Sequence, residues 1–560
     1  MTRFTLALAA SLALTACAPS WKDKRHDQLF QYEPPVTLLK PPPKLDTSDW
    51  WDMGSMLGVR PLARLVSPAR YAKVISGGRS AQDVNAFGQI ADSAWFVNRI
   101  GKRAFSTEEA FEGNAKNAGL APGTLLVISG KIDGASAGFV IKDSLGQVWY
   151  LKLDHPGFPS ISTSAEVISQ RLLWLAGYRV PIMVAVDVQP DRFVLDPKAR
   201  TRDGYNRSKP LTQGRLDQLL ANTNPNANGL VRALISKQPP GEVMGPFQYR
   251  GRRADDPNDV LDHEQRRSLR GLWLFSAWVN NTDTRMNNTL DMFRPITPDG
   301  RGVVEHYLID FGNSFAATGL GEKVQVEGWE YTVDWSAIFR NLFTFGLYQP
   351  KYLDIQRSKF RSVGMFEAKA FNPKKWKPAL PNPAFDERTD DDLFWAASIL
   401  ARIQPEHIRA AVEAGHYDEE GAADYVYETL LARRRKLLEY AFEGYLEIDR
   451  PRVEGTRLLL DDLRKLAGFG PMATVNYKVE WDRTRARDVD LAKGTSAAYD
   501  ANDPMSLSIE LAPAIASARA KSDFADEPYI TVTLSKDYGD HVAVHLRVDK
   551  DRLVPVGVDR

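Results

Sequence analysis

The chain has 560 residues, of which 43% are hydrophobic, 10% aromatic and 26% charged, a composition that excludes wholesale disorder, collagen and a multi-span membrane protein. At roughly 100–200 residues per domain, this length predicts three to five structural units. The 72 basic and 71 acidic residues give a net charge of +1, which argues against a nucleic-acid partner, and the single cysteine excludes internal disulfides and Cys-rich metal sites.

Residues 1–16 are typical of a secretory leader, because Arg3 precedes a short apolar run that cannot span about 30 Å of hydrocarbon. The run ends in Leu14-Thr15-Ala16-Cys17, which resembles the box of bacterial lipoproteins. This resemblance implies that Cys17 receives lipid and anchors the chain to a membrane. Ala18 after the cysteine favours the outer membrane, with the body facing either the periplasm or the exterior. The alternative is an ordinary cleaved leader in which Cys17 is incidental.

Residues 17–49 contain Pro34-Pro35 and Pro41-Pro42-Pro43, which predict a semi-rigid tether that holds the body away from the bilayer. Residues 50–120 predict a helical N-terminal extension. The evidence is the apolar spacing over Val84–Phe105 and a Ser106-Thr107-Glu108-Glu109 helix start. This extension carries no predicted chemistry.

Residues 121–195 predict a small mixed unit of strands, one helix and a further strand: Leu125–Ser129, Phe139–Lys142, Val148–Leu153, Ser164–Ala176 and Met183–Val188. Residues 196–450 follow as a larger unit. Its stretch 200–260 is typical of loops with one or two short helices. Three elements then follow: a strong helix, His263–Asn280, and two strands, Thr289–Phe293 and Val303–Ile309.

Residues 390–445 are again helical in pattern, and Arg433-Arg434-Arg435-Lys436 near their end predicts a solvated helix face. Trp273 and Trp278 lie at core-type spacing in the helix before them. Residues 451–560 alternate in strand fashion, as in Ile530–Leu534 and Val542–Val548, and predict a small β-rich appendage.

Three segments carry residues suited to chemistry, and the first contains Gly134, Ser136 and Gly138 between two strands. Small residues there would let backbone N–H groups approach an anion such as phosphate. Lys152 lies mid-strand between large apolar residues and needs a counter-charge or ligand if it is buried. Glu166, near the start of the following helix, could supply that charge. The alternative is a hairpin with an exposed lysine.

The second segment joins the long helix to a strand and contains Asp283, Arg285 and Asn288. The carboxylate could orient or deprotonate a hydroxyl, the amide oxygen could bind Mg²⁺, and Arg285 could balance negative charge. The alternative is an Asn-rich connecting loop. In the third segment, Asp310 ends an apolar strand before Phe311-Gly312, where a carboxylate suits a hard cation.

The order of these features resembles the protein-kinase-like superfamily over about residues 120–320, with helices to about 445 as the rest of a C-lobe. The loop Thr282–Asn288 is most similar to atypical members, namely HipA-type and phosphatidylinositol-kinase-like enzymes and secretory-pathway kinases. The resemblance implies an α+β, two-lobed fold with ATP in the cleft, an N-lobe at 121–195 and a C-lobe at 196–450.

The resemblance also implies roles for single residues. Lys152 would hold the α- and β-phosphates of ATP and pair with Glu166. Asp283 would be the catalytic carboxylate, and Asn288 and Asp310 would bind Mg²⁺.

The sequence therefore predicts a membrane-anchored extracytoplasmic lipoprotein that binds Mg-ATP and transfers a phosphoryl group to an unidentified protein or small-molecule hydroxyl. It departs from ordinary protein kinases in three ways: no full GxGxxG loop, Asn281-Thr282 before Asp283, and no Ala-Pro-Glu after Asp310. The periplasm is also not expected to hold abundant ATP. The alternative function is a noncatalytic, pseudokinase-like envelope lipoprotein that binds or scaffolds a partner, and another phosphoryl donor is a further alternative.

Two other interpretations are less favoured. Gly134-x-Ser136-x-Gly138 matches the GxSxG elbow of serine hydrolases, but that motif needs a helix after it, whereas a strand is predicted here. The histidines show no metal-ligand spacing, so His155, His263 and His306 are predicted to be surface or hydrogen-bonding residues.

Overall fold

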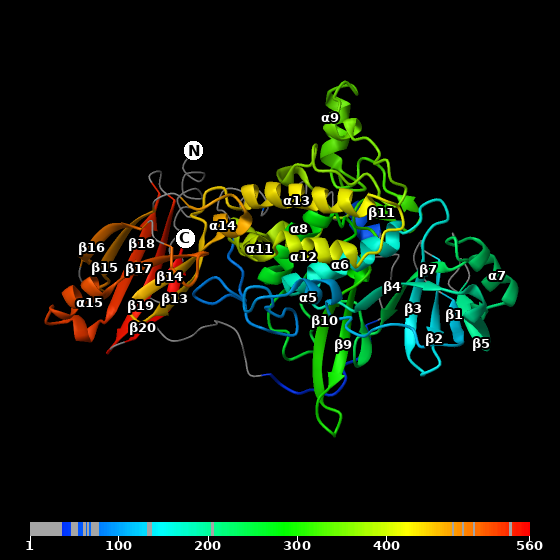
Figure 1. The fold of residues 1–560 in the computed structure, drawn as a ribbon, viewed down its shortest axis with the longest axis horizontal. Helices are drawn as coiled ribbons and strands as arrows, with labels where there is room; N and C mark the ends of the chain where they lie inside the picture. Colours follow the sequence, from blue (N-terminus) through cyan, green and yellow to red (C-terminus); the bar gives the residue numbers. More distant parts are fainter. Residues whose placement is uncertain are drawn as a thin grey trace, which may run out of the picture.

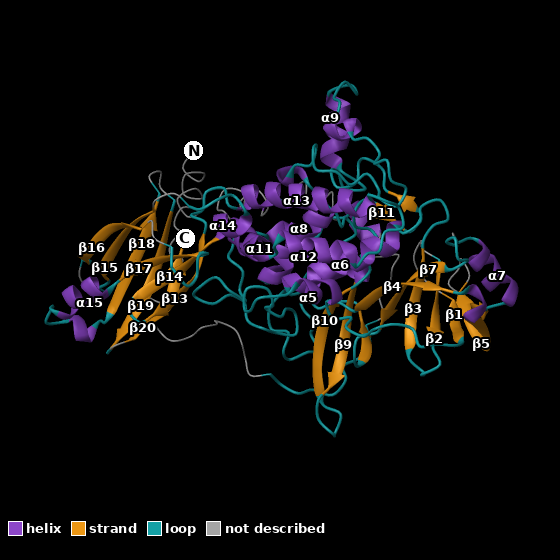
Figure 2. Ribbon diagram, in the orientation of Figure 1, coloured by secondary structure: helices purple, strands orange, loops and turns teal. Residues whose placement is uncertain are grey.

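The computed structural model contains three parts, which Figures 1 and 2 show in a row: a β-sheet lobe, a helical lobe and a β-rich appendage. The predicted α+β class is confirmed. The structure describes residues 36–45, 54–59, 63, 67–68, 78–130, 137–202, 207–223, 225–472, 475–483, 487–496, 499–536, 540–550 and 552–560.

The sheet lobe is a seven-stranded sheet in the order β4-β7-β3-β2-β1-β5-β6, in which only β1 and β5 run parallel. Its strands are β1 (Leu125–Gly130), β2 (Gly138–Lys142), β3 (Val148–Leu153), β4 (Ile182–Val188), β5 (Phe193–Arg202), β6 (Ser208–Pro210) and β7 (Val231–Lys237). Alternate residues such as Phe139, Trp149 and Leu151 form a hydrophobic cluster on one face, to which helix α7 (Gln213–Ala221) adds Leu216.

The prediction of loops with one or two short helices over residues 200–260 is correct in part: α7 is such a helix, but strands β6 and β7 were not predicted. The chain there completes β5, forms β6 and α7, and returns to the sheet as β7, which lies next to the edge strand, between β4 and β3. β6 is fully exposed and polar, so it has no hydrophobic alternation to reveal it. β7 is short, and its buried run over residues 233–235 resembles neither an amphipathic helix nor an alternating strand.

Helix α6 (Ile161–Ala176) joins the sheet lobe to the helical lobe. All of its residues except Trp174 are buried, and it contacts β4 and β7 on one side and α5 and α12 on the other. It ends at Gly177, whose φ of 126° and close approach to the ring of Phe96 leave no room for a side chain. Because almost the whole helix is buried, its polar residues, including Glu166, lie inside the protein.

The helical lobe is built around α8 (Arg267–Val279), in which Trp273 and Trp278 are buried in the core as predicted. Arg267 and Arg270 of α8 both form salt bridges to Asp392, which has no exposed surface. The other helices of this lobe are α5 (Thr107–Glu112), α10 (Pro383–Glu387), α11 (Asp390–Arg402), α12 (Pro405–Glu413), α13 (Ala422–Ala441) and α14 (Leu463–Ala467).

The basic run in α13 forms a solvated face only in part, because Arg435 is exposed but the two arginines before it are not. Arg433 and Arg434 are buried, and their guanidinium groups donate to backbone carbonyls of neighbouring helices. Arg433 bonds the carbonyls of Ala277 and Trp278, where α8 ends and its carbonyls lack helical partners. The charges therefore hold α8 in place, which a charge count along the sequence cannot reveal.

The helical N-terminal extension is wrong for described residues 78–106. This stretch has turns and isolated bridges, and its apolar residues, among them Trp95, Phe96 and Phe105, are buried in the core of the helical lobe. Their spacing reflects packing of an irregular segment rather than a helical face. The predicted helix start is present: Ser106 and Glu109 form a reciprocal capping box at the beginning of α5.

A three-stranded sheet, β8 (Glu242–Gly245), β9 (Thr289–Pro295) and β10 (Gly302–Leu308), extends from the helical lobe. Residues 36–45 of the predicted tether lie against it: Leu39 pairs with Gly302, and the N–H of Leu45 donates to the carbonyl of Met244 at 2.9 Å. This part of the tether is therefore docked on the body.

The segment between β10 and α10 contains the short pair β11 (Ala317–Thr318) and β12 (Gly321–Glu322), and helix α9 (Trp335–Phe343). Figure 1 shows α9 projecting from the rest of the molecule. Among the described residues, no helix has both the length and the apolar character needed to cross a bilayer.

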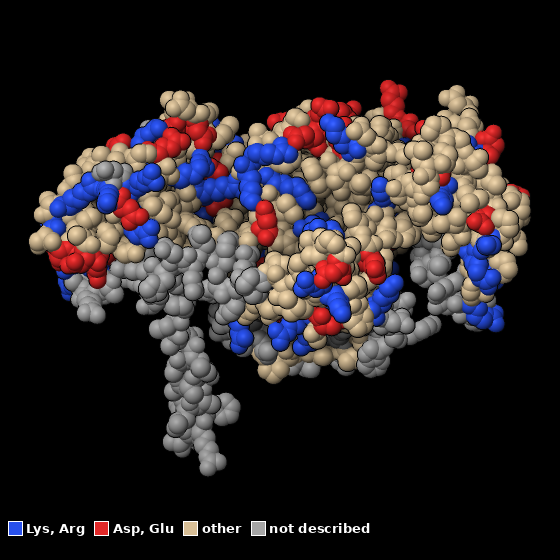
Figure 3. All heavy atoms as spheres, turned by 90° about the horizontal axis from the view of Figure 1, so that it is seen from below, with Lys and Arg blue, Asp and Glu red and all other residues tan. Residues whose placement is uncertain are grey.

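The β-rich appendage has two sheets, in the orders β13-β14-β17 and β16-β15-β18-β19-β20, with its own hydrophobic cluster. Arg402 of α11 bridges to Asp449 and Asp461 of the appendage, which ties it to the helical lobe. Basic and acidic side chains are interspersed over the face in Figure 3. The elements are β13 (Ile448–Glu454), β14 (Arg457–Asp462), β15 (Val475–Trp481), β16 (Val489–Ser496), β17 (Ser506–Glu510), α15 (Ala512–Arg519), β18 (Tyr529–Ser535), β19 (His541–Asp549) and β20 (Arg552–Asp559).

Candidate functional site

Lys152 lies at the centre of the candidate site. Because side chains alternate along β3, Trp149, Leu151 and Leu153 point into the sheet core while Lys152 points to the opposite face. Its ammonium donates to Glu166 of α6 and to Asp310 after β10, the latter at 2.9 Å. Burial opposes its charge, but Asp310 and Glu166 outweigh that effect and raise the pKa of Lys152. Lys152 is therefore a charged lysine held by two carboxylates from distant parts of the chain.

Glu166 is completely buried and uses both carboxylate oxygens. One accepts from Lys152, and the other accepts the backbone N–H of Phe311 at 2.8 Å. Glu166 thus binds the strand lysine and the Asp310-Phe311-Gly312 turn at the same time. A Cβ at Gly312 would lie 3.1 Å from the Glu166 carboxylate and 2.6 Å from Ser162 Oγ, so the turn needs glycine at this position.

Asp310 has a backbone φ of 58°, a left-handed conformation that is uncommon for residues other than glycine, asparagine and aspartate. Its side chain is 45% exposed, in contrast to the 1% of Glu166. Strained residues of this kind concentrate at functional sites. The turn therefore holds a half-exposed carboxylate that is paired with Lys152.

Strand register brings Asn288 to the same end of the sheet as Asp310. Leu308 of β10 pairs with Thr289 of β9, so the residues just outside the hairpin face each other, and the N–H of Ile309 donates to the carbonyl of Asn288 at 3.0 Å. The side-chain amide of Asn288 donates to the carbonyl of Asp283 at 2.7 Å. This bond uses the nitrogen and leaves the amide oxygen as the atom suited to a cation.

Asp283 lies in the loop of residues 280–288 between α8 and β9, here called the Asp283 loop. Its carboxylate accepts from the Asn313 side chain at 2.8 Å and lies 3.0 Å from Arg285 Nε, close enough for an ion pair but not aligned as a hydrogen bond. Asn313 follows Gly312 by one residue, so it links the Asp283 loop to the Asp310 turn. The predicted residues Lys152, Glu166, Asp310, Asn288 and Asp283 are thus joined by one chain of contacts.

Of the three small residues predicted to let the backbone approach a phosphate, only Gly138 is among the residues that the structure describes. Gly138 lies directly opposite Lys152 in the β2–β3 pair, where a Cβ would lie 2.2 Å from the carbonyl oxygen of Leu151. Gly134 and Ser136 lie outside the described residues, as does Cys17. Gly138 begins a strand and not a helix, so the context that a serine-hydrolase elbow requires is absent after this residue.

Lys323, just after β12, belongs to this site, and sequence reasoning missed it. Its buried ammonium donates to the Thr282 hydroxyl at 2.6 Å and to the carbonyls of Asn280 and Asn313. It therefore ties the Asp283 loop to the Asp310 turn from behind. Burial lowers the pKa of Lys323 to about 8, despite the opposing effects of Glu327 and Asp283. A lone lysine in an irregular segment carries no periodic signal in the sequence.

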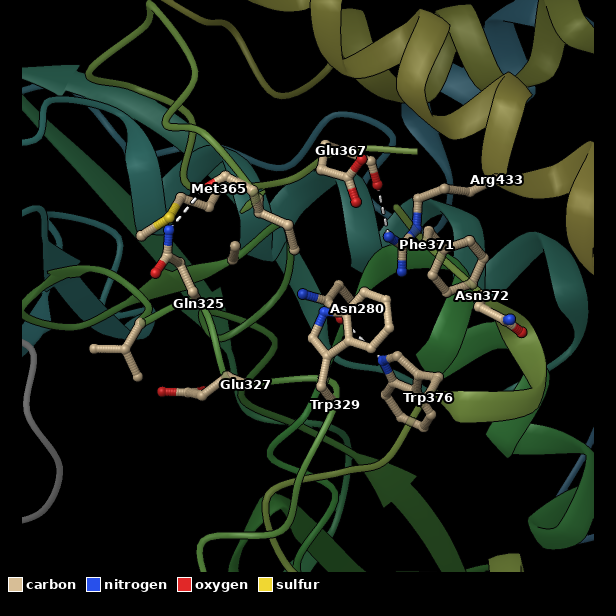
Figure 4. A pocket seen from close by; sticks show the side chains of 14 residues that line it. Asn280, Gln325, Glu327, Trp329, Met365, Glu367, Phe371, Asn372, Trp376 and Arg433 are labelled. Atoms are coloured by element: carbon tan, nitrogen blue, oxygen red, sulfur yellow. Dashed lines mark hydrogen bonds between the residues drawn. The ribbon is translucent and has the colours of Figure 1, made fainter. Parts of the chain in front are cut away.

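A small cavity behind the Asp283 loop is shown in Figure 4. It measures about 20 Å³, room for one water molecule, and is too small for a nucleotide. Asn280 at its wall ends α8 in the left-handed conformation and accepts from Trp376 Nε1 at 2.9 Å, while Arg433 on another side bonds the end of α8. This region supports the loop.

The oxygen donors of the site fit Mg²⁺. Among the described residues there is no cluster of three or more His, Cys, Asp or Glu arranged to hold a metal. Mg²⁺ in phosphotransferase sites instead uses one or two protein oxygens, with phosphate oxygens and water completing its shell. The exposed carboxylate of Asp310 and the amide oxygen of Asn288 are donors of that kind.

No protein-family model matches the sequence, and a search of curated proteins finds no significant relative. Among solved structures, the chain is similar to the "crystal structure of the Golgi casein kinase with Mn/ADP bound", with 10% identity and a TM-score of 0.29 over 72% of this chain and 94% of that one. A second structure, "Crystal structure of the golgi casein kinase", gives 10% identity and a TM-score of 0.28 over 72% and 95%. Similarity at this level does not identify a function for this chain. The functional argument therefore depends on the contacts and distances of the site.

Lys323 should make stability depend on pH. With a pKa of about 8 in the folded protein and 10.5 when exposed, the folded state binds fewer protons between these values. The free energy of unfolding should therefore rise with pH over this window, by about 1.4 kcal/mol per unit at most. Lys323→Met should remove this rise. Denaturant unfolding at several pH values measures it, and an identical pH profile in the variant would contradict the assignment.

Proposed function

We propose that this chain binds Mg-ATP between the sheet lobe and the helical lobe and transfers its terminal phosphoryl group to a hydroxyl acceptor. The observation that carries the proposal is the convergence of Lys152, Glu166 and Asp310, joined through Asn288 and Asn313 to Asp283. A protein that only needed stability would be better served by apolar residues at a buried ion pair. The Asp310 side chain is 45% exposed, so the cluster can be reached from solvent.

Each residue has a proposed role. Lys152 binds the α- and β-phosphates, and Glu166 keeps the lysine oriented and charged. Asp310 and Asn288 hold Mg²⁺, which neutralises charge on the phosphate oxygens when bound. Gly138 lets the β2 backbone approach the strand that carries Lys152.

Asp283 orients the acceptor hydroxyl and takes its proton as the hydroxyl oxygen bonds to the γ-phosphorus. The bond between that phosphorus and the bridging oxygen breaks, and ADP leaves with the bond's electrons. Arg285, paired with Asp283, contributes positive charge beside the transferring group. Asn313 fixes the second carboxylate oxygen, so the carboxylate has a defined direction.

The second candidate is a pseudokinase-like module that binds a partner without catalysis. It is favoured by the ion pair between Asp283 and Arg285, which partly neutralises the proposed base. The two candidates share the fold and differ in whether phosphoryl transfer occurs.

For both, we propose anchoring to the bacterial envelope through lipid on Cys17, with the outer membrane as the favoured location.

Nucleotide binding should stabilise the folded protein. Adding Mg-ATP at about 100 times its Kd should raise the free energy of unfolding by about 2.7 kcal/mol, measured as a shift in Tm. Asp310→Asn should abolish the shift, because it removes the charge that binds Mg²⁺ while asparagine tolerates the left-handed backbone. Asp299→Asn, an exposed carboxylate in the β9–β10 turn, is the matched control and should keep it. Absence of any shift in the parent protein would reject nucleotide binding.

Phosphoryl transfer is tested separately through Asp283. Asp283→Asn should keep the Mg-ATP stabilisation but lower transfer from radiolabelled ATP to water or to the protein's own hydroxyls by about 10²–10⁴-fold. Equal transfer by parent and variant would remove Asp283 from the mechanism. Nucleotide binding without transfer in the parent would favour the pseudokinase candidate.

A further inference from the structure

Helix α9 and the loop after it expose an unusually dense group of large apolar side chains, here called the α9 tip. Phe343 is 77% exposed, Phe345 91% and Leu347 83%. Exposed apolar residues are ordinarily scattered singly over a protein surface. The tip consists of Ile338, Phe339, Leu342, Phe343, Phe345, Leu347, Tyr348 and Leu353.

The tip is held on a fixed base. Asp334 caps the start of α9 by accepting the N–H groups of Ser336 and Ala337, and it is paired with Lys377. Arg340 of α9 forms an ion pair with Glu330, which precedes the helix, at 2.8 Å. After the tip, the side-chain amide of Gln325 donates a hydrogen bond to the carbonyl of Ile355. The apolar residues therefore project from an anchored element, as α9 does in Figure 2.

The arrangement of the tip suits an extended apolar medium better than a narrow groove. Ile338 and Leu342 form one i, i+4 stripe and Phe339 and Phe343 a second, so the apolar surface covers adjacent faces of α9. Phe345 and Leu347 continue it beyond the end of the helix. A helix that enters a protein groove ordinarily presents a single stripe.

The charge of residues 335–361 indicates what kind of apolar environment would bind the α9 tip. Residues 335–353 contain no acidic residue, and residues 335–361 contain five basic residues and one acidic residue, in a chain whose net charge is +1. The basic residues are Arg340, Lys351, Arg357, Lys359 and Arg361, of which Arg340 pairs with Glu330 and Arg357 with Glu322. Exposed apolar and aromatic side chains beside basic ones are typical of elements that lie in the interface of an anionic membrane.

We propose that the α9 tip inserts into the headgroup region of an anionic lipid bilayer, with Lys351 against the lipid phosphates. This contact is separate from the proposed lipid on Cys17 and from phosphoryl transfer. It orients the body, because a single N-terminal attachment leaves rotation free whereas a second contact fixes which face meets the bilayer.

The experiment is vesicle flotation of the protein purified without residues 1–17, a deletion that removes no residue the structure describes. The parent should float with vesicles of phosphatidylcholine and phosphatidylglycerol, and less with phosphatidylcholine alone. Added salt should weaken the binding, because it screens the basic residues. The variant Phe343→Ser/Phe345→Ser/Leu347→Ser should bind at least about tenfold more weakly, from the loss of three apolar side chains.

Leu145→Ser is the matched control, since Leu145 is 85% exposed in the β2–β3 turn, and it should bind as the parent does. Lys351→Glu should weaken binding to the anionic vesicles alone. Failure of the parent to bind anionic vesicles, or equal binding by the triple variant, would overturn the proposal. So would self-association of the parent in sedimentation that the triple variant abolishes without any change in vesicle binding, because a second copy would then cover the tip.

Discussion

A largely buried ammonium group is kept charged most effectively by negative groups in direct contact, and Lys152 has two carboxylates in this role. Glu166 reaches it from helix α6 and Asp310 from the turn after β10, so the ion pairs join the sheet lobe to the helical lobe. Loss of Glu166 would leave the half-exposed Asp310 as the remaining counter-charge of Lys152. The other carboxylate oxygen of Glu166 holds the turn through Phe311.

Charged side chains also hold the structure together behind the site, where they donate hydrogen bonds to backbone carbonyls. Arg433 bonds the last carbonyls of α8, and Lys323 bonds carbonyls in the Asp283 loop and the Asp310 turn. Asp392 holds the other end of α8 through two arginines. These contacts hold the side chains of the site on a rigid frame, which the proposed phosphoryl transfer would need, because that chemistry depends on positioning and electrostatic stabilisation.

The core of the site could be predicted from sequence because its residues break strong local patterns. Lys152 interrupts an apolar strand, and Asp310 ends another, so each must meet a charge or ligand. Lys323 and Arg433 could not be predicted, since each acts on backbone carbonyls that no side-chain pattern reports. The irregular segment 78–106 was also missed, because its buried aromatic residues serve an irregular packing whose spacing happens to resemble a helical face.

A crystal structure of the protein grown with Mn²⁺ and ADP tests the central claim most directly. The anomalous signal of manganese should lie within coordination distance of Asp310 and Asn288 oxygens, about 2.0–2.3 Å, with the Lys152 ammonium on the phosphates of the nucleotide. A nucleotide bound elsewhere would contradict the account, as would manganese that contacts neither residue while Lys152 stays paired with its two carboxylates. Lys152, Glu166 and Asp310 would then be only a structural link between the two lobes.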